Sequence, residues 1–277
     1  MHYLEGKLGG ARGTHLHTHR WLPAGEPVAI IALIHGVGEH CGRYHDLARF
    51  LTAKKCAVYA FDQRGHGKSA DSLCAHIDSW SDYREDLLAL VKSTNQNPQA
   101  PLFLLGHSMG GLVALDFALH YPEKIRGVIC SAPALHIPKQ PFWIRVVGNL
   151  MSKIKPNFRI NITLKPEAVS GDPAEIERYK RDPLIHNRVS ARWGMELMET
   201  AQRIARCAAQ FQTPLLIYHG GDDRIVPAEA SQNFITQMSS DIDRELIVYP
   251  GGMHESHHDL HRQQTLNDTW KWISHRL

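Results

Sequence analysis

The sequence contains few cysteines, and none of them has the spacing of a metal-binding or redox motif. The five cysteines, which are Cys41, Cys56, Cys74, Cys130 and Cys207, include no C-x-x-C pair. An odd number of cysteines in a chain of 277 residues argues against a framework of disulfide bonds. We therefore expect a protein of a reducing compartment, the cytoplasm.

Other absences exclude further classes of protein. No apolar run is long enough to span a bilayer, and the segment from Met1 to Glu5 lacks the basic and apolar regions that begin a signal peptide. Lysine and arginine are scattered and the net charge is only +3, so no nucleic-acid partner is expected. There is no internal repeat, and the chain is long enough for one domain, or for one domain with a lid.

What is present is an alternation of strand and helix patterns. A Gly-rich alternating segment, Tyr3 to Pro23, comes first and is typical of a β-hairpin. Strands are then predicted at Val28–Ile34, Cys56–Phe61, Pro101–Leu105, Gly127–Ser131, Pro214–His219 and Glu245–Tyr249. Helices are predicted at Arg43–Lys54, Trp80–Lys92, Gly111–Tyr121, Ala228–Met238 and from near Leu260. This order predicts a mostly parallel sheet that helices cover on both faces.

The stretch from Leu135 to Ala209 is far longer than a simple crossover between two strands requires. We therefore expect a core of residues 1–134 and 210–277, and a cap of residues 135–209. The cap begins with an apolar stripe at helical spacing: Trp143, Val146, Val147, Leu150, Met151 and Ile154. The stripe predicts a helix packed on the core or a lid over an apolar pocket. The basic residues beside it also permit contact with a membrane or micelle surface.

The segment Gly106-His107-Ser108-Met109-Gly110 fits the G-x-S-x-G pattern of a nucleophile elbow. A predicted strand precedes it and a predicted helix follows, so Ser108 is placed on the sharp strand-to-helix turn that exposes its hydroxyl. The glycines leave room where a Cβ atom would clash. Ser108 is the candidate nucleophile.

A serine hydroxyl needs a base, and the base needs an orienting acid, in the chain order serine, acid, histidine. Asp222 and Asp223 both follow a predicted strand, and Asp223 is chosen because it directly precedes the turn Arg224–Pro227. The alternative is that both carboxylates only cap the next helix. His254 follows a glycine pair just past the next strand and is the candidate base.

The oxyanion of a tetrahedral intermediate needs two N–H donors. The backbone N–H of Met109 is one candidate, because it follows the nucleophile. The backbone N–H of Val37, in the Gly-rich loop after the first buried strand, is the other. His35 in the same loop is interpreted as a structural hydrogen-bonding residue.

Taken together, these segments resemble the monoglyceride lipase and lysophospholipase family of α/β hydrolases. The similar segments are residues 35–44, 62–69, 106–111, 220–227 and 249–255, with Arg181–Leu184 inside the cap. The resemblance implies an α/β-hydrolase fold with a mostly parallel eight-stranded sheet and a helical cap inserted after strand six. It also implies a Ser108, Asp223 and His254 triad, an apolar-lined cap and no cofactor.

Two other motifs are open to a metal-binding interpretation. His254-Glu255-Ser256-His257-His258 fits the zinc-protease pattern H-E-x-x-H, but that pattern requires a helix and here it follows Pro250-Gly251-Gly252. His15, His17 and His19 alternate and so share one face of a strand, where a polar edge strand is the preferred account. The segment 62–67 lacks the Walker Lys-Ser/Thr pair and is interpreted as a structural turn near the site.

We therefore expect a serine hydrolase that cleaves carboxylic esters with one long acyl chain, of the monoacylglycerol type. The alternatives are a lysophospholipase, a broad carboxylesterase or thioesterase, and a catalytically silent ligand-binding protein of this fold. The expected partner is a small lipid ester, with Trp143, Val146, Val147, Leu150 and Met151 as candidate substrate-binding residues of the cap. Acyl length, head group and oligomeric state are left open.

Overall fold

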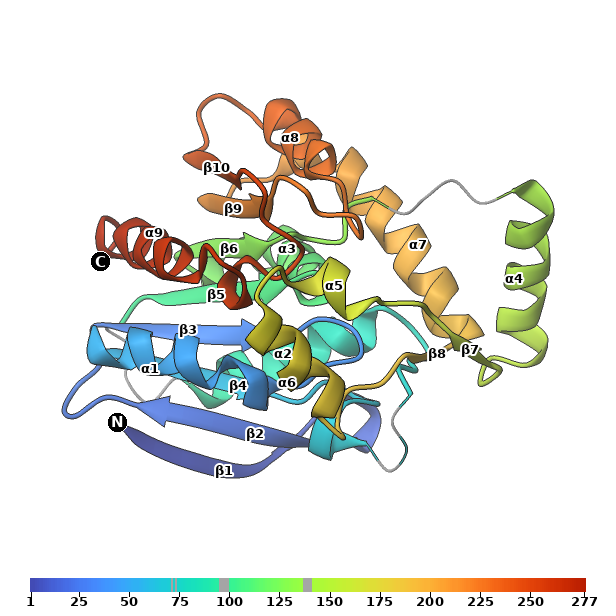
Figure 1. Ribbon diagram of the computed structural model, residues 1–277, viewed down its shortest axis with the longest axis horizontal. Coiled ribbons are helices and arrows are strands. Elements are labelled where there is room, and N and C mark those ends of the chain that lie inside the picture. Colours follow the sequence, from blue (N-terminus) through green and yellow to red (C-terminus); the bar gives the residue numbers. More distant parts are fainter. Residues whose placement is uncertain (71, 73, 95–99, 137–140) are drawn as a thin grey trace.

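The fold is built around one sheet, shown in Figure 1, in a computed structural model that describes residues 1–277 except 71, 73, 95–99 and 137–140. The eight strands are β1 (His2–Gly9), β2 (His15–Leu22), β3 (Ala29–Ile34), β4 (Cys56–Phe61), β5 (Leu102–His107), β6 (Gly127–Ser131), β9 (Leu215–Gly220) and β10 (Arg244–Tyr249). Their order across the sheet is β1-β2-β4-β3-β5-β6-β9-β10. Pairs from β4 to β10 are parallel, whereas β2 pairs antiparallel with both β1 and β4. The predicted eight-stranded, mostly parallel sheet is confirmed.

Helices cover both faces of the sheet, and two apolar cores result. On one face, α1 (His45–Ala53) and α9 (Arg262–Ser274) contribute Leu47, Leu51 and Trp272 to the core. On the other, α2 (Ser81–Ser93), α3 (Met109–His120) and α8 (Ala228–Gln237) bury apolar side chains against the sheet. Strands β3, β5, β6 and β9 are buried along their whole length because helices lie above and below them.

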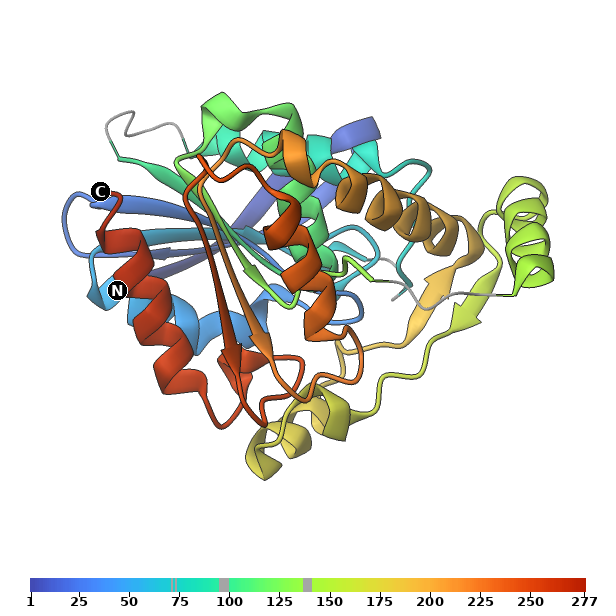
Figure 2. The same cartoon turned by 90° about the horizontal axis from the view of Figure 1, so that it is seen from above.

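The segment between β6 and β9 forms a separate group of short elements. These are α4 (Phe142–Ile154), β7 (Arg159–Asn161), α5 (Pro166–Val169), α6 (Pro173–Arg181), β8 (Arg188–Ser190) and α7 (Ala191–Arg206). Strands β7 and β8 pair antiparallel in a sheet of their own. In Figures 1 and 2, α4 stands at the far end of the molecule, beyond α7 and away from the sheet.

The apolar stripe predicted at the start of the cap falls on α4, but most of it faces outward. Trp143 is 66% exposed and Ile154 is 72% exposed. The side of α4 that meets α7 carries small residues instead: a Cβ atom at Gly148 would lie 3.2 Å from the Met195 sulfur, and Ser152 is buried. The interpretation of this helix as one packed on the core through its apolar stripe is therefore wrong.

Two further expectations can be compared with the fold. The predicted N-terminal hairpin is confirmed as β1 and β2, but the account of His15, His17 and His19 as part of an edge strand is wrong. Strand β1 is the edge, and β2 lies between β1 and β4. Among the helices in the described ranges, none combines the length and the apolar character needed to cross a membrane.

Candidate active site

Ser108 lies on a strained turn between β5 and α3. Its backbone has φ 51° and ψ −115°, a conformation that side-chain-bearing residues rarely adopt. The turn is tight on both sides: a Cβ atom at Gly106 would lie 2.3 Å from the Gly110 carbonyl oxygen, and one at Gly110 would lie 2.2 Å from the Ile34 oxygen. The two glycines of the motif are therefore required by close backbone approach, and the turn lifts Ser108 above the end of β5.

The loop after β3 passes directly beside this turn. A Cβ atom at Gly36 would lie 3.4 Å from the Cβ of Ser108, so the chain at residues 36–37 borders the serine. The Gly36 N–H is already donated to Glu39 Oε1 at 2.6 Å. In the described part of the chain, the backbone N–H groups of Val37 and Met109 have no hydrogen-bond acceptor. Met109 directly follows Ser108, and Val37 lines the same cavity as Ser108, so two unoccupied donors lie near the serine.

His254 and Asp223 come from the loops that follow β10 and β9. His254 Nδ1 donates to Asp223 Oδ2 across 2.6 Å, and both side chains are buried. Burial raises the pKa of the Asp223 carboxyl, but His254, together with hydrogen bonds from His219 and Val226, outweighs burial and holds the pKa well below its ordinary value. Asp223 is therefore a carboxylate at neutral pH, and it fixes the His254 tautomer that leaves Nε2 free.

Ser108 and His254 line the same small cavity. Its volume is about 40 Å³, and its other lining residues include Val37, Leu164, Val169, Tyr179 and Ile225. No hydrogen bond joins Ser108 to His254 among the described residues. Asp222, the rejected alternative, is exposed and lies outside this group. The structure thus brings the three predicted triad residues together with Val37 and Met109.

His219 also holds Asp223, and it was not predicted from the sequence. Its Nε2 lies 3.1 Å from Asp223 Oδ2 and 2.8 Å from the Val226 carbonyl oxygen. Because both partners are acceptors, Nε2 carries the hydrogen, and Nδ1 accepts from Ser231 Oγ at 2.9 Å. Its position at the end of a predicted strand, four residues before Asp223, was the available signal.

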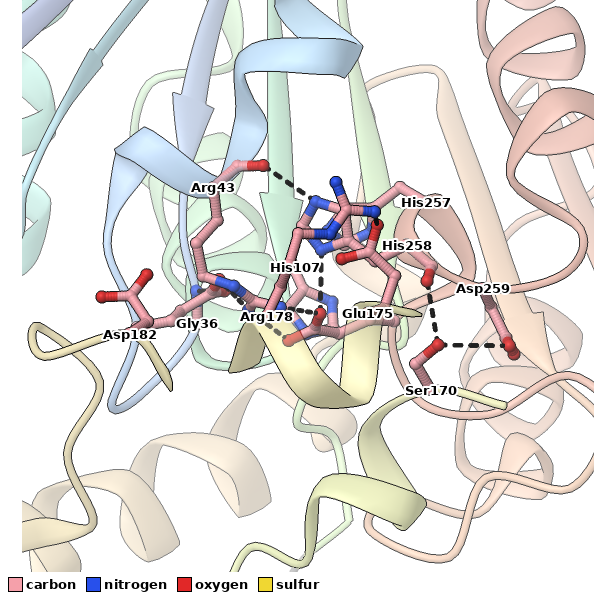
Figure 3. A network of polar contacts seen from close by, with 12 residues as sticks. Gly36, Arg43, His107, Ser170, Glu175, Arg178, Asp182, His257, His258 and Asp259 are labelled. Atoms are coloured by element: carbon pink, nitrogen blue, oxygen red, sulfur yellow. Dashed lines mark hydrogen bonds and ion pairs between the residues drawn. The ribbon is translucent and has the colours of Figure 1, made fainter. Parts of the chain in front are cut away.

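A buried ion cluster joins the loop of Val37 to the loop of His254. Arg43, in the short helix Cys41–Tyr44, donates to both oxygens of Glu255 at 2.6 Å each and to Glu39 Oε2 at 2.8 Å. Burial raises the pKa of Glu39, but the Arg43 guanidinium reverses this and the pKa lies below its ordinary value. His258 adds a bond to Glu255. A second bond joins His258 to the Arg43 carbonyl oxygen, and Figure 3 shows these two residues side by side. The cluster was not predicted from the sequence.

His107, which precedes the nucleophile, packs edge-on against His254 with ring centroids 4.7 Å apart. Burial and the neighbouring His254 lower the pKa of His107 to about 4. The imidazole is therefore neutral at physiological pH and adds no positive charge beside His254, the candidate base. His35, as expected, is structural: its Nε2 accepts from the Gln63 N–H at 2.8 Å.

The H-E-x-x-H motif has no helix to hold it. His254 donates to Asp223, whereas His258 is bonded to Glu255, which also binds Arg43. Residues Ser256–His258 form only a short 3-10 turn. The two histidines of the pattern thus have separate partners, which contradicts the zinc-protease interpretation. The turn at residues 62–67 is structural as expected, because Asp62 accepts from the N–H groups of Cys41 and Lys68.

The candidate cap residues do not line the cavity at Ser108. Trp143, Val146, Val147 and Leu150 are exposed on α4, and Met151 is half-buried. The cap reaches the cavity instead through Leu164, Val169 and Tyr179. Cap backbone also holds the loop of His254: the carbonyl oxygens of Ala168 and Val169 accept from the N–H groups of His254 and Glu255.

A second, larger hollow lies on the other side of Arg43. Its volume is about 810 Å³, and it runs between α6 and the chain at residues 40–46. Its lining is charged and includes Arg43, Glu175, Arg178, Asp182 and His258, which Figure 3 shows close together. Such a lining suits water or a polar group and not an acyl chain.

The chain is similar to known hydrolases of this fold. Residues 25–261 match the family described as serine aminopeptidase, S33. A monoacylglycerol lipase of Mycolicibacterium smegmatis is 33% identical over 99% of this chain and 98% of its own length. A monoglyceride lipase of Rattus norvegicus is 31% identical over 98% of this chain and 90% of its own. The crystal structure of a Paleococcus ferrophilus monoacylglycerol lipase superposes with a TM-score of 0.84 and 28% identity, covering 100% of both chains.

Proposed function

Since this chain belongs to the serine aminopeptidase S33 family of α/β hydrolases and is a serine ester hydrolase, we propose that its substrates are monoacylglycerols. The observation that carries the mechanism is one cavity shared by Ser108, on its strained turn, and His254, whose imidazole Asp223 orients. The small lipid esters on which the named relatives act support the choice of substrate. The cap, residues 135–209, is the segment that we assign to substrate binding.

In the proposed reaction, His254 Nε2 takes the hydroxyl proton of Ser108 as Oγ attacks the ester carbonyl carbon. The N–H groups of Val37 and Met109 donate to the resulting oxyanion. His254 then gives its proton to the leaving glycerol oxygen as the C–O bond breaks, which leaves an acyl group on Ser108. Water, deprotonated by His254, releases the fatty acid. Asp223 stabilises the imidazolium in both halves of the reaction.

The surroundings of the cavity support an ester with an apolar acyl part. Leu164, Val169 and Ile225 present apolar surface beside Ser108, and each methylene buried there stabilises the complex by about 0.8 kcal/mol. We assign the exposed apolar side of α4 to contact with the lipid phase from which such a substrate is drawn. An amine-recognising peptidase site would need a free carboxylate, but Glu39 and Glu255 at this cavity both bind Arg43.

The test compares the wild-type protein with Ser108→Ala and with Ser240→Ala, which changes an exposed serine far along the sequence. A fluorophosphonate probe, which reacts with activated serines, should label the wild type and Ser240→Ala and should not label Ser108→Ala. The same three proteins are then given monoacylglycerols, lysophospholipids, acyl thioesters and aminoacyl anilides. We expect release of fatty acid from monoacylglycerols, lost only in Ser108→Ala.

Other outcomes decide against specific parts of the proposal. Labelling of Ser108→Ala at the wild-type level would exclude Ser108 as nucleophile. Labelling with turnover of only lysophospholipids, thioesters or anilides would keep the triad and change the substrate. A folded wild-type protein that neither labels nor turns over any ester would favour the silent ligand-binding alternative.

A further inference from the structure

Three metal-ligating side chains of the N-terminal hairpin lie on one face of the sheet. Glu5 is in β1, and His17 and His19 are in β2. Glu5 pairs with His19 across the two strands, and His17 is two residues from His19, so all three side chains project to the same side. One ligand atom from each residue lies within 4.8 Å of the other two. We infer that Glu5, His17 and His19 form a zinc-type binding site, which we call the hairpin site.

The contacts within the hairpin site already bring the ligand atoms close together. His17 Nε2 lies 2.9 Å from Glu5 Oε2. The Tyr3 hydroxyl lies between His19 and Glu5, 2.7 Å from His19 Nδ1 and 2.8 Å from Glu5 Oε1. A tetrahedral ion with bonds of about 2.0–2.2 Å needs such a compact set, and water supplies its fourth ligand. Metal binding replaces the proton shared by His17 and Glu5 and moves the Tyr3 hydroxyl aside.

The second ring nitrogen of His19, Nε2, lies near a carboxylate that could support metal binding at Nδ1. Its Nε2 is buried, forms no hydrogen bond within the described residues, and lies 3.4 Å from Asp62 Oδ1. A metal-bound histidine characteristically presents its second ring nitrogen to a carboxylate, which fixes the tautomer and the ring orientation. Asp62 therefore prepares His19 Nδ1 for the ion.

The composition of the site selects the metal. Two imidazole nitrogens and one carboxylate oxygen suit Zn²⁺ and similar borderline cations better than Mg²⁺ or Ca²⁺, which prefer oxygen ligands. Lys68 competes with the ion, because its Nζ lies 2.8 Å from Glu5 Oε2. The Lys68 side chain is 48% exposed, so it can turn into solvent when a cation binds.

The other clusters of potential ligands in the described part of the chain have ligand atoms that backbone N–H groups or a buried arginine already hold. In the group His35, Cys41 and Asp62, backbone N–H groups already donate to His35 Nε2 and to both Asp62 oxygens. In the two groups that contain Glu255, the carboxylate is held by Arg43. The hairpin site differs because the groups that compete with the ion, Tyr3 and Lys68, are exposed side chains that can turn into solvent. The bound ion would tie β1 to β2.

The test is a titration of metal-free protein with Zn²⁺ against a chromophoric chelator, and with Co²⁺ followed by its visible absorption. Wild type should bind one tight equivalent of Zn²⁺ and give the intense absorption of tetrahedral Co²⁺. Glu5→Gln and His17→Ala should each weaken binding at least tenfold. Lys68→Gln should bind more tightly. His15→Ala is the matched control, because His15 is exposed on the same strand but lies outside the cluster.

The outcomes distinguish binding at the hairpin site from non-specific Zn²⁺ binding by surface histidines. Circular dichroism of each variant in excess chelator verifies that the fold is intact, so weaker binding reports lost ligands. The inference is overturned if wild type binds no Zn²⁺ tightly. It is also overturned if His15→Ala weakens binding as much as His17→Ala, or if Glu5→Gln binds like wild type. None of these measurements depends on the proposed esterase activity.

Discussion

Each oxygen of Asp223 holds a different part of the site. Oδ1 accepts from the N–H groups of Ile225 and Val226 at 2.8 and 3.0 Å, which fixes the loop after β9. Oδ2 accepts from His254 and His219, which fixes the base. Asp222, one residue earlier, is exposed. Adjacent carboxylates thus differ in burial and in partners.

This difference gives a matched pair of substitutions. In Asp223→Asn, the amide can still accept from the loop N–H groups, but its NH₂ would face His254 Nδ1 and reverse the tautomer. We expect kcat to fall by about 10⁴-fold, as in other triads with this change. Asp222→Asn should leave kcat nearly unchanged. Steady-state kinetics on a monoacylglycerol would check both, and the opposite pattern would mean that Asp222 is the acid.

At the residue scale, the sequence predicted Ser108, Asp223 and His254 as one group because each follows a recognisable strand. It did not locate the partners that hold them. Arg43 and Glu255 are 212 positions apart along the chain, and no local pattern relates residues at that separation. The spacing of Glu39 and Arg43, four residues apart, was visible but is typical of many surface ion pairs.

The turn between β5 and α3 depends on the absence of two Cβ atoms. Gly110→Ala would drive a methyl group into the backbone oxygen of Ile34, which belongs to the central strand β3 and cannot move aside. We expect unfolding at a temperature several degrees lower, or failure to fold, with loss of activity. Differential scanning calorimetry would measure the change.

Gly194 provides the control for that substitution. It lies inside α7, and a Cβ atom there would meet nothing within 4 Å. Gly194→Ala should therefore stabilise the protein by about 0.5–1 kcal/mol, because alanine restricts the unfolded chain and favours the helix. If both substitutions had the same effect, the close packing around Gly110 would not be what constrains the turn.

The outward apolar side of α4 makes a separate prediction. Replacing Trp143, Val147 and Leu150 by serine removes exposed apolar surface, so the fold should be retained. Binding to phospholipid vesicles should weaken at least tenfold, because each apolar side chain that enters lipid contributes about 1 kcal/mol or more. Hydrolysis of a water-soluble short ester should be unchanged.

Vesicle co-sedimentation and the soluble-ester assay measure the two effects separately. Asn149→Ser is the matched control, because Asn149 is an exposed polar residue of the same helix. Equal vesicle binding by the triple variant and wild type would show that α4 has another role. The sequence predicted this helix well, because its stripe is periodic. Which way the stripe faces could not be predicted, since that depends on small residues packing against α7.

Across the whole molecule, several histidines are buried in their neutral form. Burial lowers the pKa of His35, His66, His107 and His257 below the ordinary value of 6.5. In the unfolded chain these groups take up protons below pH 6.5, whereas in the folded protein they do not. The stability that they contribute is complete above pH 6.5 and is lost as the pH falls toward the folded value, which for His107 is about 4.

We therefore expect the free energy of unfolding to fall between pH 6.5 and pH 5, by about 1.4 kcal/mol per pH unit for each such histidine that is charged only when unfolded. Urea denaturation at closely spaced pH values would measure the slope. His107→Gln should make the slope shallower while the other histidines maintain it. A stability that is equal at pH 7 and pH 5 would contradict this account.

The mostly parallel sheet with helices on both faces was predictable because each strand and helix has a local pattern and the two kinds alternate along the chain. The burial of so many histidines could not be predicted, since the histidine side chain is polar and is often exposed. His35 was interpreted as structural from its loop, but no local pattern marks His66 or His107 as buried, and loops that meet only in three dimensions enclose them.

The cavity at Ser108, at about 40 Å³, has room for a few water molecules, each of which needs about 10–15 Å³ of such space. An ester with its acyl chain does not fit in this volume, so we expect substrate to bind an open conformation. Leu164, Val169 and Tyr179 line the cavity from the cap side, and we expect them to separate from Ser108 when substrate binds. The apparent affinity for substrate is then the intrinsic affinity multiplied by the open fraction. The rate of such an enzyme depends on any condition that changes the open fraction, as well as on the concentration of its substrate.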